Sequence, residues 1–347
     1  MNMIKLKFML RESNINIPLL CVVSALLIIF PFVIRGHFEQ NMAILILMWA
    51  SLASAWNIFG GYTGQVSLGH AIFFGMGAYG AVVPFIKWNV TPWIGIFIGM
   101  ACATLLALII ALPIFRLSAQ YFAIATVALG ETVRIIAVNT PFVGGAAGID
   151  IMRPKANPWY AVQFMTKTPY YYFFLIILSL VFFLMLYINS SKMGYYFRTI
   201  KANQIAAASV GIDTRKYKTI ALVISACITS LCGSFYAQYQ LYVDPNTAFL
   251  GAISTRMVMM AVIGGIGTMM GPILGAVALV PLSEYTRATF GATIPGIDQV
   301  LYGVLILLII LYQPKGVVVL IQNIFKKFNS FLFKMMKRRG YHDTSKS

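Results

Sequence analysis

Residues 92–115 read PWIGIFIGMACATLLALIIALPIF and contain no charged side chain. As a helix rising about 1.5 Å per residue, such a run is long enough to cross a bilayer core about 30 Å thick. Comparable runs recur along the chain, which has 347 residues, 60% of them apolar and 10% charged. Soluble proteins carry roughly 25% charged residues. The sequence therefore predicts an all-α, polytopic transmembrane helical bundle and excludes a water-soluble fold.

A basic loop in the middle of the chain separates two groups of apolar stretches. They cover about 17–34, 41–59, 65–86, 92–115, 120–138 and 169–188 before the loop, and 219–242, 252–283 and 299–313 after it. The stretch at 252–283 is too long for one crossing. It carries Gly264, Gly265, Gly267 and Gly271, so we expect it to turn back as two helices. The total is then about ten crossings, within a range of eight to ten, with interrupted Gly-rich helices in both halves.

The net charge of +17 comes from 26 Lys and Arg residues against 9 Asp and Glu residues. Many of the basic residues flank apolar segments, at 5–11, 192–218 and 326–346. Loops rich in Lys and Arg stay on the cytoplasmic side of a membrane. A nucleic-acid partner is not expected, because it would need a continuous basic face.

This charge pattern divides the chain into three parts. We expect a cytoplasmic N-terminus over 1–16, a single transmembrane domain over 17–320 that includes a cytoplasmic loop at 189–218, and a basic cytoplasmic tail over 321–347. Both termini then lie on the same side of the membrane.

A Gly-rich segment that reads GGYTGQVSLGH over residues 60–70 interrupts the apolar pattern of the first half. Irregular backbone at membrane depth is tolerated where it is buried in protein or lines an aqueous cavity. A translocation path is the functional interpretation, and close helix packing through small residues is the structural alternative. The polar side chains favour the path, although a lone histidine is more often a satisfied hydrogen-bonding residue than a proton carrier. The residues assigned to the path are Gly61, Tyr62, Gly64, Gln65, Ser67, Gly69 and His70.

A second Gly-rich segment, GGIGTMMGPILG over residues 264–275, loosely echoes residues 69–80. Paired interrupted segments in the two halves of a transporter point to a binding or transit site at their interface. The echo can also arise by chance. On the first interpretation Gly264, Gly265 and Gly267 join the predicted path.

Glu131 and Arg134 lie three residues apart in an apolar span, on nearly one helical face. Ionisable residues inside membranes are costly and usually paired. We predict an intramembrane ion pair that closes helix packing, and direct contact with a substrate is the alternative.

Residues 203–211, NQIAAASVG, predict a short helix in the basic loop that ends at Gly211. A helix of this length is marginal in water and needs a surface to dock on. That surface is either another protein or the chain's own bundle. The residues assigned to docking on a partner are Asn203, Gln204, Ala206, Ala207 and Gly211.

Catalytic signatures are missing from the sequence. It has no Gly-rich phosphate loop, no assignable Ser/His/Asp or Cys/His set and no cluster with metal-ligand spacing. The chain is therefore predicted to be a transport subunit without catalytic residues, metal or cofactor, and energy from ATP would have to come from partner subunits.

Several motifs together resemble the permease subunits of bacterial branched-chain amino acid ABC importers, of the LivM type. The motifs are GYTGQVSLGHA at 61–71, YFAIAT at 121–126, Gly130-Glu131, Gly144-Gly145, Gly148-Ile149, Ile205-Ala206-Ala207, Gly211-Ile212-Asp213, GGIGT at 264–268 and Gly271-Pro272. Their order and spacing cover roughly residues 40 to 320.

The resemblance implies a multi-pass subunit of the bacterial cytoplasmic (inner) membrane that translocates leucine, isoleucine and valine. It also implies a second related permease subunit, two cytoplasmic ATP-binding subunits and a periplasmic or lipid-anchored substrate-binding protein. The loop at Ala206, Ala207 and Gly211 would then dock on an ATP-binding subunit. Loops of this kind often carry Glu before the Ala-Ala pair, where this chain has Ile205. Docking would therefore depend on shape and apolar packing.

Other functions remain open on the sequence. Importers of urea or short amides use similar permeases. An ion-coupled secondary amino acid transporter would need intramembrane carboxylates, for which Glu131 is the clear candidate. A membrane enzyme is disfavoured, because no catalytic set is present.

Overall fold

The computed structural model describes residues 17–34, 36–117, 119–151 and 158–290, with single positions between 296 and 311. Seven helices in this part of the chain are long and apolar enough to cross a membrane. The predicted polytopic helical bundle is confirmed. The predicted N-terminal segment 1–16, most of the last span at 299–313 and the tail 321–347 lie outside the described residues, so ten crossings stay a prediction.

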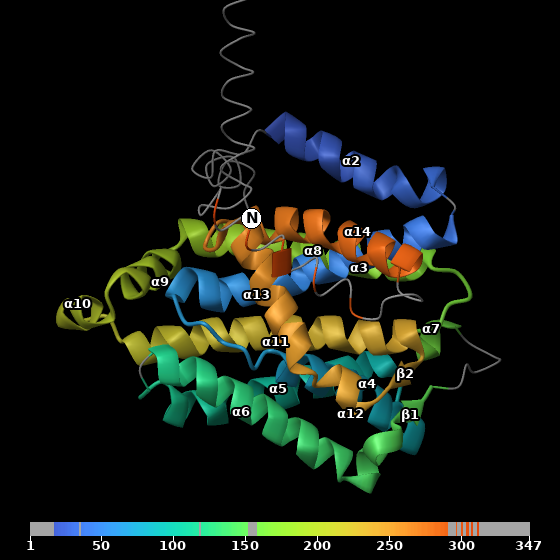
Figure 1. Ribbon diagram of the computed structural model, residues 1–347, viewed down its shortest axis with the longest axis horizontal. Helices are drawn as coiled ribbons and strands as arrows, with labels where there is room; N and C mark the ends of the chain where they lie inside the picture. The colour runs from blue at the N-terminus through green and yellow to red at the C-terminus, as the bar shows by residue number, and fades with distance from the viewer. Residues whose placement is uncertain are drawn as a thin grey trace, which may run out of the picture.

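Nine long helices form the bundle within the described residues (Figure 1). They are α2 (Ile17–Val33), α3 (His37–Trp56), α4 (Ala71–Trp88), α5 (Pro92–Ile114), α6 (Ala119–Val138), α8 (Thr168–Ser190), α11 (Thr214–Gln240), α13 (Gly251–Gly265) and α14 (Gly271–Phe290). A π-helical turn, Asn57–Gly61, extends α3.

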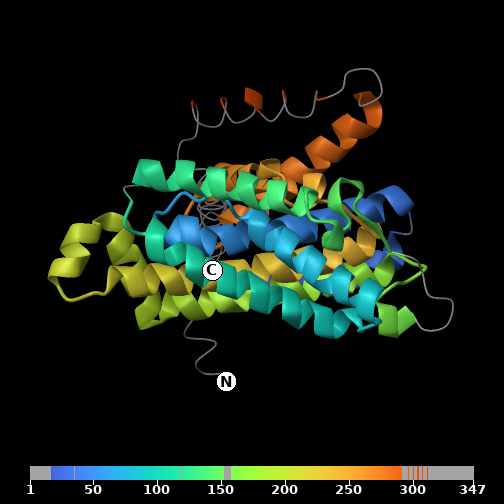
Figure 2. The ribbon, with the colours of Figure 1, turned by 90° about the horizontal axis from the view of Figure 1, so that it is seen from below.

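Short elements mark the two ends of the bundle, as Figures 1 and 2 show. One end, which we call the α10 end, carries α9 (Lys192–Ala202) and α10 (Gln204–Ser209). The other, which we call the β end, carries α7 (Pro158–Ala161), α12 (Pro245–Ala248) and two 3₁₀ turns (Pro141–Val143 and Gly145–Ala147). There β1 (Ile149–Asp150) pairs antiparallel with β2 (Tyr242–Val243), with Ile149 opposite Val243.

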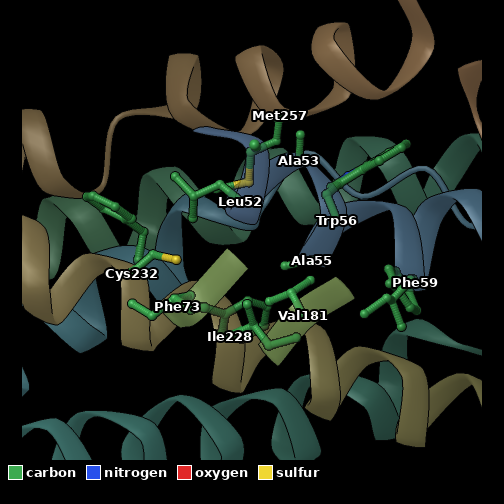
Figure 3. Packing of buried hydrophobic residues seen from close by; sticks show 14 of the residues in the cluster. Leu52, Ala53, Ala55, Trp56, Phe59, Phe73, Val181, Ile228, Cys232 and Met257 are labelled. Atoms are coloured by element: carbon green, nitrogen blue, oxygen red, sulfur yellow. The ribbon is translucent and has the colours of Figure 1, made fainter. Parts of the chain in front are cut away.

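Helix α11 lies at the centre of the bundle against α3, α4 and α5. Glycines allow its close approach to α4, since a Cβ on Gly77 would lie 1.9 Å from the Ser230 carbonyl oxygen. Figure 3 shows the adjoining apolar core, where Trp56 of α3, Val181 of α8, Ile228 of α11 and Met257 of α13 are buried. Packing through small residues is typical of helices inside membranes.

The predicted break in the long apolar stretch of the second half is present. Helix α13 ends at Gly265 and α14 begins at Gly271. Gly265 and Gly267 have φ angles of 130° and 78°, which favour glycine. The two helices pack closely where they meet, because a Cβ on Gly264 would lie 1.7 Å from the Gly271 carbonyl oxygen.

Two predicted boundaries were wrong. The span expected at 65–86 begins as a helix only at Ala71, because Gly64 has a φ of 76° and residues of the segment 64–70 form hydrogen bonds with side chains of α6 and α11 in place of a helical backbone pattern. The basic loop at 189–218 is mostly helical: α9 was missed, and α11 already begins at Thr214. Ser191 separates α8 from α9, and its extended backbone lets the chain turn there.

Candidate translocation and coupling site

The two Gly-rich segments meet at the α10 end of the bundle. A Cβ on Gly61 would lie 2.9 Å from the Gly267 nitrogen, and a Cβ on Gly267 would lie 2.9 Å from the Gly61 carbonyl oxygen. Asn57 joins them, because its Oδ1 accepts from the Gly267 N–H at 2.8 Å and its Nδ2 donates to the Thr268 carbonyl at 2.8 Å. Sequence reasoning missed Asn57, although an amide inside an apolar span just before Gly60-Gly61 was a signal.

Lys201 of α9 lies against the same junction. A Cβ on Gly64 would be 3.2 Å from Lys201 Cγ, and a Cβ on Gly267 would be 2.7 Å from Lys201 Nζ. Burial lowers the pKa of Lys201 below its ordinary value. Helix α9 therefore touches one Gly-rich segment from each half of the chain. A displacement of α9 would therefore change its contacts with both Gly-rich segments.

His70 and Ser67 lie deeper in the bundle, in a separate hydrogen-bonded cluster. His70 is fully buried, with Nε2 2.9 Å from Ser225 Oγ and Nδ1 3.0 Å from Ser67 Oγ. Ser225 donates its own proton to the Ala55 carbonyl at 2.6 Å, so it accepts from His70 Nε2–H. The ring nitrogen Nδ1 then accepts from Ser67. A neutral histidine satisfies this cluster, which favours a structural role for His70.

The remaining residues of the predicted path occupy different surroundings. Tyr62 is buried and Gln65 is half-buried. Gly69 packs on α6, where its Cβ would lie 2.6 Å from the Thr126 carbonyl oxygen. Gly264 and Gly265 are the last two residues of α13, where the chain enters the turn to α14. The structure thus brings Gly61, Gly64 and Gly267 together and places Ser67, Gly69 and His70 elsewhere, and their role in translocation stays a prediction.

Glu131 and Arg134 form the ion pair that their spacing predicts. Arg134 Nη2 lies 2.5 Å from Glu131 Oε1, and Arg134 Nε lies 3.0 Å from Oε2. Arg134 Nη1 also donates to Asn246 Oδ1 at 2.5 Å, which ties α6 to α12. The Glu131 side chain is 52% exposed in this chain, so the pair lies on an outer face of the bundle. The bridge from Arg134 to Asn246 supports a packing role for the pair, and its contact with a substrate stays a prediction.

The predicted helix in the basic loop is present as α10. Asn203 caps it, because Oδ1 accepts from the N–H groups of Ile205 and Ala206 at 2.9 and 3.0 Å. Gly211 follows with a φ of 85°. Gln204 Oε1 accepts from Lys218 Nζ at 2.5 Å, which holds α10 to the start of α11.

One residue of the predicted docking face was misplaced. Ala207 is fully buried against its own chain and cannot touch a partner, because α10 is folded back onto α9 and α11. The exposed side of α10 instead presents Ile205, 80% exposed, and Val210, 73% exposed. One face of the helix therefore lies on its own bundle and the other faces outward, and docking of that outward face on a partner stays a prediction.

The described residues contain no group of three or more His, Cys, Asp or Glu side chains that could hold a metal ion. What the site offers is a contact between an outward-facing helix pair and the two Gly-rich backbone segments.

Comparison with known proteins gives a family for this arrangement. Residues 40–310 match the family described as branched-chain amino acid transport system / permease component. The chain is 26% identical over 320 residues to the high-affinity branched-chain amino acid transport system permease protein LivM of Escherichia coli K12, a match that covers 86% of this chain and 73% of the relative.

Two further relatives extend the comparison. The probable LivM of Methanocaldococcus jannaschii is 23% identical over 277 residues, covering 71% of this chain and 78% of the relative. The permease protein LivH of Escherichia coli K12 is 25% identical over 134 residues, covering 39% of this chain and 42% of the relative. No solved structure matches the chain.

Proposed function

The chain belongs to the family of permease components of branched-chain amino acid transport systems, and from this premise we propose that it is a membrane-spanning subunit of an ATP-driven importer of leucine, isoleucine and valine. It is a multi-pass membrane protein and a transport subunit. The observation that carries the proposal is the outward-facing helix α10, which is joined through α9 to the junction of the two Gly-rich segments.

An ATP-binding subunit is the partner that we propose docks on the exposed face of α10. A motor subunit must act on the permease through a surface outside the bilayer, and α10 offers Ile205 and Val210 there. Lys201 then lies between that surface and the Gly61–Gly267 contact. Movement of the ATP-binding subunit would shift α9 and loosen or tighten the junction. This route supports a mechanical role for the basic loop.

The remaining partners follow from the family. We propose a second related permease subunit, two cytoplasmic ATP-binding subunits and a substrate-binding protein on the outer side. The two relatives named LivM and LivH are each called a permease protein of a branched-chain amino acid transport system. A pair of different permease subunits fits that observation. The proposed location is the bacterial cytoplasmic membrane, with both termini inside.

Purification of the tagged chain in mild detergent tests the subunit composition. The expected result is co-elution of a second permease chain and an ATP-binding subunit in fixed ratio. A chain that elutes alone and transports amino acids on a proton or sodium gradient would contradict the proposal, and would support a secondary transporter instead.

Substrate choice needs a separate experiment. The complex is reconstituted with its binding protein, and uptake of radiolabelled leucine is measured against an excess of unlabelled valine or urea. Valine should compete and urea should not. Competition by urea alone would move the assignment to importers of urea or short amides.

A further inference from the structure

A pocket of about 580 Å³ opens near the β end of the bundle, at the opposite end from α10. Small-molecule sites in proteins commonly enclose roughly 300–1,000 Å³. Helices α3, α4, α11, α13 and α14 all contribute to its wall, so it lies between elements from both halves of the chain. Neither the path residues nor the coupling helix described above line it.

Two guanidinium groups line this pocket. Arg256 comes from α13 and Arg287 from α14, which are the two arms of the Gly-rich hairpin. The Arg256 guanidinium carbon lies 5.7 Å from the centre of the Trp49 ring, and this cation–π contact orients it. Arginine has a planar fork of donors that matches a carboxylate. Charged residues inside membrane segments are costly and mark substrate pathways.

The acidic groups near the pocket differ in what they can do. Asp244 also lines it, but its carboxylate accepts from Thr247 N–H at 3.0 Å and from the Thr247 hydroxyl at 2.6 Å, and so caps α12. Glu284 lies three residues before Arg287 on α14 and is not among the residues that line the pocket.

Apolar side chains form the rest of the wall. Trp49, Phe74, Leu250 and Ile253 belong to this apolar part of the lining. The Phe74 and Tyr236 rings lie 5.6 Å apart, which holds this side of the wall in place. A branched aliphatic side chain would be removed from water there, at a gain of about 25 cal/mol for each Å² buried.

We propose that this pocket binds the transported amino acid, with Arg256 and Arg287 holding its carboxylate and the wall of Trp49, Phe74 and Ile253 taking its apolar side chain. This proposal rests on the proposed function, which gives the class of substrate. What it adds is the place in the permease where that substrate binds. Because both arginines lie on the hairpin whose turn contains Gly267, binding in the pocket and movement at the α10 end involve the same element.

The first test uses the whole complex in proteoliposomes with its binding protein. Arg256→Gln and Arg287→Gln should each lower leucine import about tenfold, the loss expected for one charge-assisted hydrogen bond of roughly 1.5 kcal/mol. Arg256→Lys should import faster than Arg256→Gln, because lysine keeps the positive charge but lacks the planar guanidinium donors of arginine. Arg116→Gln, an exposed arginine outside the lining, is the matched control and should import normally. Normal import by both pocket variants would overturn the proposal.

A second measurement keeps both arginines in place. Ile253→Cys is introduced into the complex without binding protein, and its reaction with a maleimide is compared with that of the unmodified chain. L-leucine at millimolar concentration should slow the reaction, and L-leucinamide, which lacks the carboxylate, should not. Equal protection by the two, or none by leucine, would contradict the site. If the unmodified complex imports leucine with ATP while this protection fails, the pocket is wrong and the proposed function stands.

Discussion

Asn57, Gly61 and Gly267 hold the two halves of the chain together through backbone contacts that leave no room for side chains. The Asn57 amide bonds both the Gly267 N–H and the Thr268 carbonyl, and so completes hydrogen bonds that the turn between α13 and α14 leaves open. Lys201 covers this contact from α9. A small change at one of these residues should therefore reach both Gly-rich segments.

Gly267→Ala is the most direct test at this scale. Its φ of 78° strains any other residue, and the new Cβ would lie 2.9 Å from the Gly61 carbonyl oxygen. We expect a loss of about 1–3 kcal/mol in stability, seen as a lower melting temperature of the purified complex. Gly251→Ala is the matched control, because nothing lies within 4 Å of its Cβ. Equal melting temperatures for both variants would show that the junction is loose.

The sequence predicted some of these residues and could not predict others. Gly61, Gly64 and Gly267 stand out because dense glycine in an apolar span has few explanations. Asn57 and Lys201 were missed, since their importance comes from contacts with segments far away in the chain. The pocket arginine Arg287 was missed for the same reason. Conversely, the Glu131–Arg134 pair follows from helical spacing alone.

At the scale of elements, α10 is held by its own chain on one face and is open on the other. Ala207 is fully buried, whereas Ala206 one position earlier is exposed. The two residues therefore separate the folding of the helix from its docking. A bulky side chain should act on a different property at each position.

Ala207→Trp should destabilise the contact of α10 with α9 and α11, because overpacking a buried small residue costs about 1–3 kcal/mol. Ala206→Trp should leave the melting temperature of the permease unchanged and weaken co-purification of the ATP-binding subunit. Thermal unfolding and co-purification of both variants give the comparison. If Ala206→Trp binds the ATP-binding subunit normally, the exposed face of α10 is not its docking surface.

Periodicity predicted the elements well where one apolar run makes one helix, as in α5 and α8, and the length of the run at 252–283 with its glycines predicted the hairpin of α13 and α14. It failed at the start of α4, because hydrogen bonds to α6 and α11 hold residues 64–70 outside any helix. It also missed α9, whose mixed sequence forms a helix by burying Gly194, Phe197 and Ile200. Tertiary contacts decided the start of α4 and are not visible in a single sequence, whereas the three-residue spacing of Gly194, Phe197 and Ile200 was a signal for α9.

For the whole molecule, the bundle has one end with α9 and α10 and another with the β pair and α12 (Figure 1). The distribution of Lys and Arg in the basic loop predicts that the first end is cytoplasmic. We expect Ser209→Cys, at the α10 end, to react with a membrane-impermeant thiol reagent only after the cells are opened. Met165 lies near the β end and is 86% exposed. A Met165→Cys variant should therefore react with the same reagent in intact cells. The reverse labelling pattern would show that the bundle is inserted in the opposite orientation.

Coupling of ATP hydrolysis to import through α10 is the central claim, and one measurement tests it most directly. ATP hydrolysis and leucine uptake are followed together in proteoliposomes that hold the complete complex and leucine-loaded binding protein. The account predicts that Ile205→Asn lowers both rates together by about tenfold or more. The substitution replaces an apolar side chain that is 80% exposed on α10 and is proposed to contact the ATP-binding subunit. The control Met165→Asn, at the opposite end, should leave both rates unchanged. Uptake by Ile205→Asn at the unmodified rate, or uptake by the unmodified complex without ATP, would contradict the account.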